Sequence, residues 1–132
     1  LILHNYGAQR YVGSVNVEID EYLPLSEVSQ RLNELQIEIY KIYRIYLVFG
    51  VYSVNLGQDE SRACVANLLS EFSSVRGFHA FFIDSKKKSV RFDVVVDFVE
   101  KNLGRLRAEI ERKVALSFPE YKIFIVIDRE FA

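Results

Sequence analysis

The chain contains two histidines, His4 and His79, and several carboxylates that fall on strand-like segments or at their ends. Imidazole and carboxylate groups that converge can hold a divalent cation such as zinc, manganese or iron. The candidates in the second half are His79, Asp93, Asp97 and Asp128, whereas His4 is the candidate in the first half. The competing interpretation is that these side chains occupy the solvent-exposed positions of strands in which polar and apolar residues alternate. The spacing of the residues is compatible with both interpretations.

No pattern of residues indicates catalysis, and we expect that the protein is not an enzyme. Neither histidine stands in an H-E-x-x-H segment, and a single cysteine excludes a C-x-x-C pair. Cys64 lies beside the apolar stripe of a predicted helix, which is typical of a buried structural thiol. The six glycines are scattered, so they form no phosphate-binding loop, and no nucleophile is paired with a base.

The composition is that of a packed, soluble chain. Half of the 132 residues are hydrophobic and 14% are aromatic, which is typical of an ordered domain. The formal net charge of −1 argues against nucleic acid as a partner, because phosphate binding relies on excess Lys and Arg. No apolar run reaches the roughly 18–20 residues needed to cross a bilayer. One cysteine cannot form an internal disulfide, which fits a reducing compartment.

One segment resembles an RNA-binding signature. The string "RGFHAFFI", beginning at Arg76, is similar to the R-G-F-[GA]-F-V segment of RNA recognition motifs. His79 is an extra residue within that pattern. The segment also falls on the first strand after a helix, where the RNA motif needs the second. RNA binding is therefore the weakest of three function classes that we consider.

The elements that must position the candidate residues are repeated along the chain. The string "YRIYLVFG", which begins at Tyr43, is matched by "YKIFIVID" from Tyr121, and the marked difference between them is Gly50 against Asp128. In the first half, alternation predicts a hairpin over residues 1–20, and apolar steps of three and four predict a helix over residues 25–42. A strand follows from Tyr43. The second half repeats this order after an additional helix.

This repeat predicts an α+β fold of two tandem ferredoxin-like (metallochaperone-like) units, in which helices pack on small mixed sheets. We expect the first unit to comprise residues 1–55 and the second to comprise residues 56–132. The chain starts without methionine and is expected to be part of a longer protein. A leading helix of the first unit would then lie upstream of Leu1.

Residues 1–52 resemble the C-terminal cytosolic domain of cation diffusion facilitator transporters. The segment "HNYGAQRYVGSVNVEID", followed by "LPLSEVSQRL", is close to the family pattern H-N-Y-G-P-G-R-R-F-x-S-V-H-V-E-V-D and a helix. In the family, a strand ending in I-H-x-D-P comes next. The second half, with "FDVVVD" and the terminal "IDREF", is similar to the extra copy that some members carry. The resemblance spans nearly the whole chain.

The departures from the family pattern concern its metal ligands. Four residues stand where the family has ligands: Asn16, Ser29, Gly50 and Tyr52. In the second copy His79 takes the place of a histidine–aspartate pair, and Asp128 keeps an acid at the end of the last strand. The resemblance therefore implies that the first copy has lost its site, with His4 as a poor substitute. We expect at most a micromolar site, centred on His79 and helped by Asp128 and by Asp93 or Asp97.

The resemblance implies a cytosolic regulatory and dimerisation domain of a divalent-cation/proton antiporter. Its expected partners are a second copy of itself and membrane helices of the same full-length chain, at the cytoplasmic face of the cell membrane. No nucleic acid is expected. The alternative is a ligand-binding or structural tandem module of the same fold that is unrelated to transport.

Overall fold

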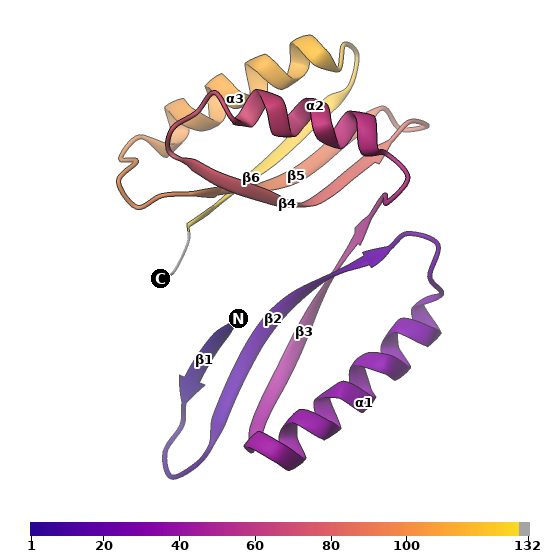
Figure 1. Cartoon of the computed structure of the whole chain (residues 1–132), viewed down its shortest axis with the longest axis vertical. Helices are drawn as coiled ribbons and strands as arrows, with labels where there is room; N and C mark the ends of the chain where they lie inside the picture. Colours follow the sequence, from indigo (N-terminus) through magenta and orange to yellow (C-terminus); the bar gives the residue numbers. More distant parts are fainter. Residues whose placement is uncertain (130–132) are drawn as a thin grey trace. The chain divides into compact units, whose positions relative to one another are not determined.

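The computed structural model describes residues 1–129, so Glu130 and Phe131 of the terminal "IDREF" lie outside the described residues. The chain divides into two compact units, the first comprising Leu1–Ser53 and the second beginning at Val54. The sequence had placed this division after residue 55. Each unit is a three-stranded sheet with its own helix or helices (Figure 1), which confirms the predicted α+β class of two tandem ferredoxin-like units.

The first unit contains strands β1 (Ile2–Asn5) and β2 (Tyr11–Asp20), helix α1 (Leu25–Tyr43) and strand β3 (Ile45–Val54). Strands β1 and β2 form an antiparallel hairpin, and β2 is also hydrogen-bonded to β3. The arrows of β2 and β3 point the same way in Figure 1, because α1 carries the chain back between them. The sheet is therefore mixed.

Strand β3 begins later than predicted. Helix α1 continues through Tyr43, and Arg44 ends it in the left-handed region with a φ of 57°, its N–H donating to the carbonyl of Tyr40. The string that begins at Tyr43 is thus divided between a helix and a strand. The prediction of a strand from Tyr43 was wrong by two residues, since alternation along the strand does not report how far the preceding helix runs.

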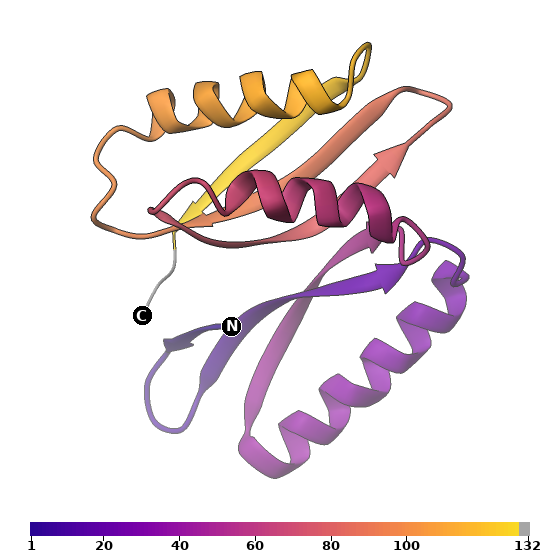
Figure 2. The same ribbon diagram turned by 45° about the horizontal axis from the view of Figure 1, so that its top comes forward.

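The second unit contains helix α2 (Asp59–Leu69), strands β4 (Val75–Asp84) and β5 (Ser89–Val96), helix α3 (Leu103–Ser117) and strand β6 (Lys122–Arg129). Strand β5 is antiparallel to β4 and parallel to β6. Both helices lie on the same side of this sheet (Figure 2). The order β-β-α-β is therefore the same in the two units, and we call the face of the second sheet opposite its helices the open face.

The core of the second unit lies between the sheet and its two helices. On β5, four side chains spaced by two are fully buried, because alternate residues of a strand point to the same face: Val90, Phe92, Val94 and Val96. Helix α2 contributes Val65 and Leu69 to the same cluster. Helix α3 contributes Leu106, Ile110 and Val114, at steps of four residues. The side chains between the buried positions of β5 consequently point to the open face.

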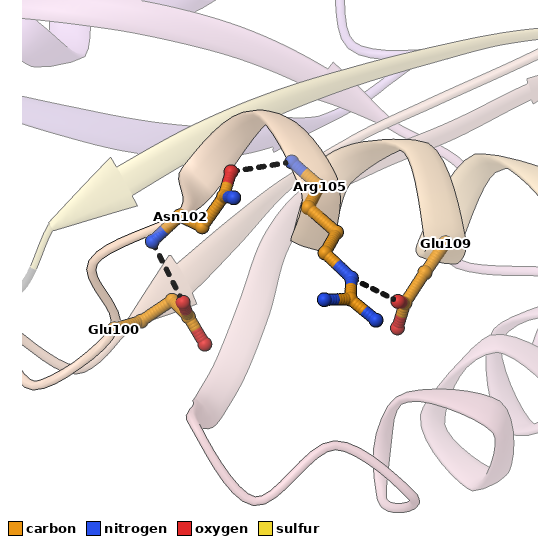
Figure 3. Close-up of polar contacts among 4 residues, drawn as sticks. All are labelled: Glu100, Asn102, Arg105 and Glu109. Atoms are coloured by element: carbon orange, nitrogen blue, oxygen red, sulfur yellow. Dashed lines mark hydrogen bonds and ion pairs between the residues drawn. The ribbon is translucent and has the colours of Figure 1, made fainter.

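The start of α3 is held by a polar cap (Figure 3). The side-chain oxygen of Asn102 accepts a hydrogen bond from the N–H of Arg105 at 3.1 Å, and the N–H of Asn102 donates to Glu100 at 2.8 Å. One turn further, Nε of Arg105 donates to Glu109 at 3.1 Å. Because an N-cap satisfies a backbone donor that the helix leaves unpaired, this arrangement fixes where α3 begins and which side chains it turns toward the sheet.

The first unit buries much less of its apolar surface. Of the predicted stripe of α1, only Val28 is buried, whereas Leu25 and Ile42 are 78% and 70% exposed. Residues 1–53, all of which the structure describes, include no second helix comparable to α2. In the described part of the chain, no helix combines the length and the apolar character needed to span a bilayer.

Gly13 on β2 occupies a position without room for a side chain. A Cβ atom there would lie 2.7 Å from Cδ2 of both Leu3 and Leu47 and 2.9 Å from the carbonyl oxygen of Ile2. We expect Gly13→Ala to lower the free energy of unfolding by about 1–3 kcal/mol, because overpacking forces neighbouring groups apart. Urea denaturation followed by circular dichroism measures this change. The matched control is Gly57→Ala, whose Cβ would meet no atom within 4 Å, and equal losses in both variants would contradict the prediction.

Candidate metal centre

His79, Asp93 and Asp128 come from the three adjacent strands of the second sheet. His79 on β4 is directly opposite Asp93 on β5, and Asp128 on β6 is paired with Val95. Asp93 lies between two core positions of β5, so it projects from the open face. Asp128 follows a core-packed residue of β6, Ile127, and projects from the same face.

A β-bulge in β4 decides the direction of His79. Between the pairs His79–Asp93 and Phe82–Arg91, β4 has one residue more than β5. Ala80 takes a φ of 54° at this point and is fully buried. The extra residue allows the side chains on both sides of the bulge, of Phe78 and Phe81, to pack in the core. His79 therefore remains on the open face, beside Asp93.

The imidazole of His79 lies between two carboxylates. Its Nδ1 is 3.7 Å from Oδ2 of Asp93, and its Nε2 is 3.5 Å from Oδ2 of Asp128. Both distances exceed the roughly 2.7–3.2 Å of a direct hydrogen bond. They are close to the separation of about 3.4 Å expected for two ligands of one tetrahedral zinc ion. The structure thus brings together His79, Asp93 and Asp128, three of the metal ligands that the sequence suggested.

One imidazole ring cannot present both of its nitrogens to the same ion. A cation at Nε2 would have Asp128 as its carboxylate ligand, and a cation at Nδ1 would have Asp93. The Asp128 side chain is 50% exposed and leaves room for water ligands, whereas that of Asp93 is 8% exposed. Within residues 1–129, no group of three or more His, Cys, Asp and Glu side chains is arranged to hold a metal. The arrangement offers any one cation two protein ligands.

Asp97 is separate from this cluster. It follows the end of β5, four residues and so roughly 13 Å along the strand from Asp93. Its carboxylate accepts hydrogen bonds from the guanidinium of Arg76 and from the N–H of Val99. The bond from Arg76, and then that from Val99, hold the pKa of Asp97 below its ordinary value. Sequence reasoning missed Arg76, although its position at the start of β4 places it beside the end of the antiparallel β5.

Removing the Arg76 charge should raise the pKa of Asp97 toward the ordinary carboxyl value. A lowered folded-state pKa stabilises the protein above the unfolded-state pKa of about 3.9, and this stabilisation is lost as the pH falls through the folded-state value. The stability difference between wild type and Arg76→Gln should therefore be present at neutral pH and disappear in acid. NMR titration of the Asp97 carboxyl carbon measures the shift. The exposed Arg112→Gln is the control, and an unchanged Asp97 titration in Arg76→Gln would contradict the assignment.

His4 has no comparable surroundings. It lies on β1 opposite Val12, is exposed, and its ring lies edge-on to that of Tyr6 with centroids 6.5 Å apart. Among the described residues, no carboxylate lies within ion-pair distance of its imidazole. His4 is thus a single imidazole on a surface strand, without the second ligand that a metal site needs.

Two of the four residues Asn16, Ser29, Gly50 and Tyr52 are neighbours in the first unit. A Cβ atom at Gly50 would lie 2.2 Å from the side-chain oxygen of Asn16, so the Asn16 amide fills the space beside Gly50. Tyr52 lies two residues further along β3. Ser29 belongs to α1 and lines an open groove of about 290 Å³ between that helix and β3. These positions carry no imidazole, carboxylate or thiolate, so they supply none of the usual ligands of a transition metal.

Corresponding positions lie on the two parallel strands of each unit. Asn16 of the first copy corresponds to Asp93 of the second, and Gly50 corresponds to Asp128. Only the second unit has carboxylates there. No family model, no curated protein and no solved structure matches this chain.

Proposed function

We propose that this chain is the cytosolic regulatory and dimerisation domain of a divalent-cation efflux transporter. Transport itself would be carried out by membrane helices of the same full-length chain, with this domain at the cytoplasmic face of the cell membrane. The observation that supports the proposal is that the corresponding positions lie on the two parallel strands of each unit. Asn16 and Gly50, where the resembling family has metal ligands, are neighbours. Their counterparts Asp93 and Asp128 flank His79.

Metal would regulate such a domain by shifting the balance between its states. A cation shifts an equilibrium by the difference between its affinities for the two states, and dimerisation and binding then strengthen each other. With His79 and Asp128 as its two ligands, a cation would complete its coordination with water or with a second copy. Phe124 and Val126 precede Asp128 on the open face of β6 and are each 53% exposed. They provide apolar surface for that second copy.

The alternative is a ligand-binding or structural tandem module unrelated to transport. It is favoured by the amide and glycine at Asn16 and Gly50, which give the first unit no metal ligand. Such a module would associate without any dependence on metal. RNA binding, the third class, would require an affinity clearly tighter than the non-specific range of roughly 10⁻⁴–10⁻⁶ M.

Sedimentation equilibrium at about 100 μM protein tests the proposal, since association depends on concentration. We expect a homodimer in the presence of chelator, a tighter homodimer in zinc or manganese, and no effect of the cation on His79→Ala. A monomer under every condition would contradict the proposal, and a dimer that ignores metal would favour the structural alternative. Reading the gene upstream of Leu1 is decisive for transport, which requires apolar membrane-spanning segments there.

A further inference from the structure

One end of the first unit gathers tyrosines and cations. The turn between β1 and β2 reads "NYGAQRY", and the last turn of α1 with the start of β3 reads "YKIYRIY". Both segments lie at the same end of the unit (Figure 1). Together they contain five tyrosines and three basic residues but no acid. Six of these side chains line the grooves described below, and we call them the basic–aromatic end: Arg10, Tyr11, Tyr40, Lys41, Arg44 and Tyr46.

The three cations of this end are not neutralised. The guanidinium of Arg44 lies over the ring of Tyr40, 5.7 Å from its centroid. In the described part of the chain, no carboxylate is within ion-pair distance of Arg10, Lys41 or Arg44. Arg31, the remaining basic residue of this unit, is paired with Glu27 at 2.6 Å. The first unit therefore presents a locally positive surface on a chain whose net charge is −1.

One groove between the cations is largely apolar, and both grooves beside them are accessible. A groove of about 530 Å³ is lined by Ile37, Tyr40 and Tyr46 together with Lys41 and Arg44. A second groove, of about 490 Å³, shares Tyr40, Arg44 and Tyr46 and continues onto the turn between β1 and β2. Ile37, Tyr40 and Tyr46 are 54%, 47% and 49% exposed. Apolar rings and a branched aliphatic side chain thus stand beside unpaired positive charge.

We propose that the basic–aromatic end binds the anionic surface of a lipid bilayer. Lys and Arg attract acidic headgroups, tyrosine favours the headgroup level, and an aliphatic side chain such as Ile37 gains by reaching the acyl boundary. Nucleic acid fits this surface less well. Three cations neutralise few phosphates, and the side chain of an exposed isoleucine cannot form hydrogen bonds with base edges. The proposal does not depend on transport, since a membrane contact of this kind needs no spanning helix.

Co-sedimentation with vesicles tests this binding directly. We expect the 132-residue chain to bind vesicles of phosphatidylcholine that contain about 30% phosphatidylserine, and to bind pure phosphatidylcholine only weakly. Raising the ionic strength should release the protein, because surface charges interact over about 10 Å at 0.1 M salt and about 3 Å at 1 M. Equal binding to both vesicle types, or binding to neither, would overturn the proposal.

Charge removal at this end should weaken binding selectively. Each basic residue near an anionic surface contributes about fivefold, so Lys41→Gln/Arg44→Asn should lose about 25-fold. Asparagine is chosen because it tolerates the left-handed conformation of Arg44. Arg10→Gln, in an exposed turn, gives an independent loss of about fivefold if the double variant folds poorly by circular dichroism.

The control removes two charges elsewhere. Lys86→Gln/Lys87→Gln alters the turn between β4 and β5 and should keep vesicle binding within about twofold of wild type. An equal loss in this variant would attribute the binding to net charge and overturn the assignment. Oligonucleotide binding that is lost in Lys41→Gln/Arg44→Asn, without any vesicle binding, would also overturn it in favour of nucleic acid. Vesicle binding by a chain whose gene encodes no membrane spans would leave this inference standing while the transporter proposal fails.

Discussion

Zinc added to the metal-free protein is expected to bind with a micromolar dissociation constant at best, and His79→Ala is expected to remove that binding. Two protein ligands fall short of the four that a stable zinc site requires. Loss of an outer-shell partner alone typically costs about 10–100-fold in affinity, so loss of the imidazole itself should cost more. Isothermal titration of both proteins measures the difference. Nanomolar binding that survives His79→Ala would show that the site lies elsewhere.

Two carboxylate variants locate the cation beside the ring. Asp128→Asn should weaken binding, because Asp128 faces Nε2 at 3.5 Å and is accessible to water. Asp97→Asn is the matched control and should bind as wild type does, since that carboxylate is held by Arg76. Binding should also weaken in acid, because a proton competes with the metal for the imidazole nitrogen. An equal effect of the two carboxylate variants would contradict the placement at Nε2.

Phe92→Ala is expected to lower the free energy of unfolding of the second unit by about 3–5 kcal/mol. Phe92 is fully buried on β5, and its ring contacts those of Phe78 and Phe81 at centroid distances of 6.0 and 6.4 Å. Truncation removes apolar contacts and leaves a cavity, because the surrounding strands and helices relax only in part. Urea denaturation monitored by circular dichroism provides the midpoint and the slope.

The control for this substitution is on the neighbouring strand. Phe124 lies on β6 and is 53% exposed, so Phe124→Ala should change the free energy of unfolding by less than about 1 kcal/mol. The two substitutions delete the same atoms, and only their burial differs. Similar losses in the two variants would show that the open face is covered in the folded protein under the conditions of the measurement.

Local periodicity was sufficient to predict the elements and the class of the fold. The buried face of β5 follows from alternation alone, because successive side chains of a strand point to opposite faces. The two similar strings that begin at Tyr43 and Tyr121 predicted the repeat. Segments with the same order of apolar and polar residues are expected to form the same element and to bury the same side of it. The ends of the elements did not follow from periodicity, as the extension of α1 to Tyr43 shows. There the capping conformation of Arg44, and not the apolar pattern, decided where the helix stopped.

Only the tertiary structure decided which candidate residues meet. The extra residue of β4 between His79 and Phe82 keeps His79 on the open face, and strict alternation of residues in the sequence does not predict such a bulge. Asp93 and Asp97 look alike in sequence, but only Asp93 lies opposite His79, because the register between strands is set by the packing of both. The sequence likewise contained the tyrosines and cations of the basic–aromatic end. Their grouping depends on the turn between β1 and β2 lying at the same end of the unit as the last turn of α1, because β2 carries the chain away from that end and α1 carries it back.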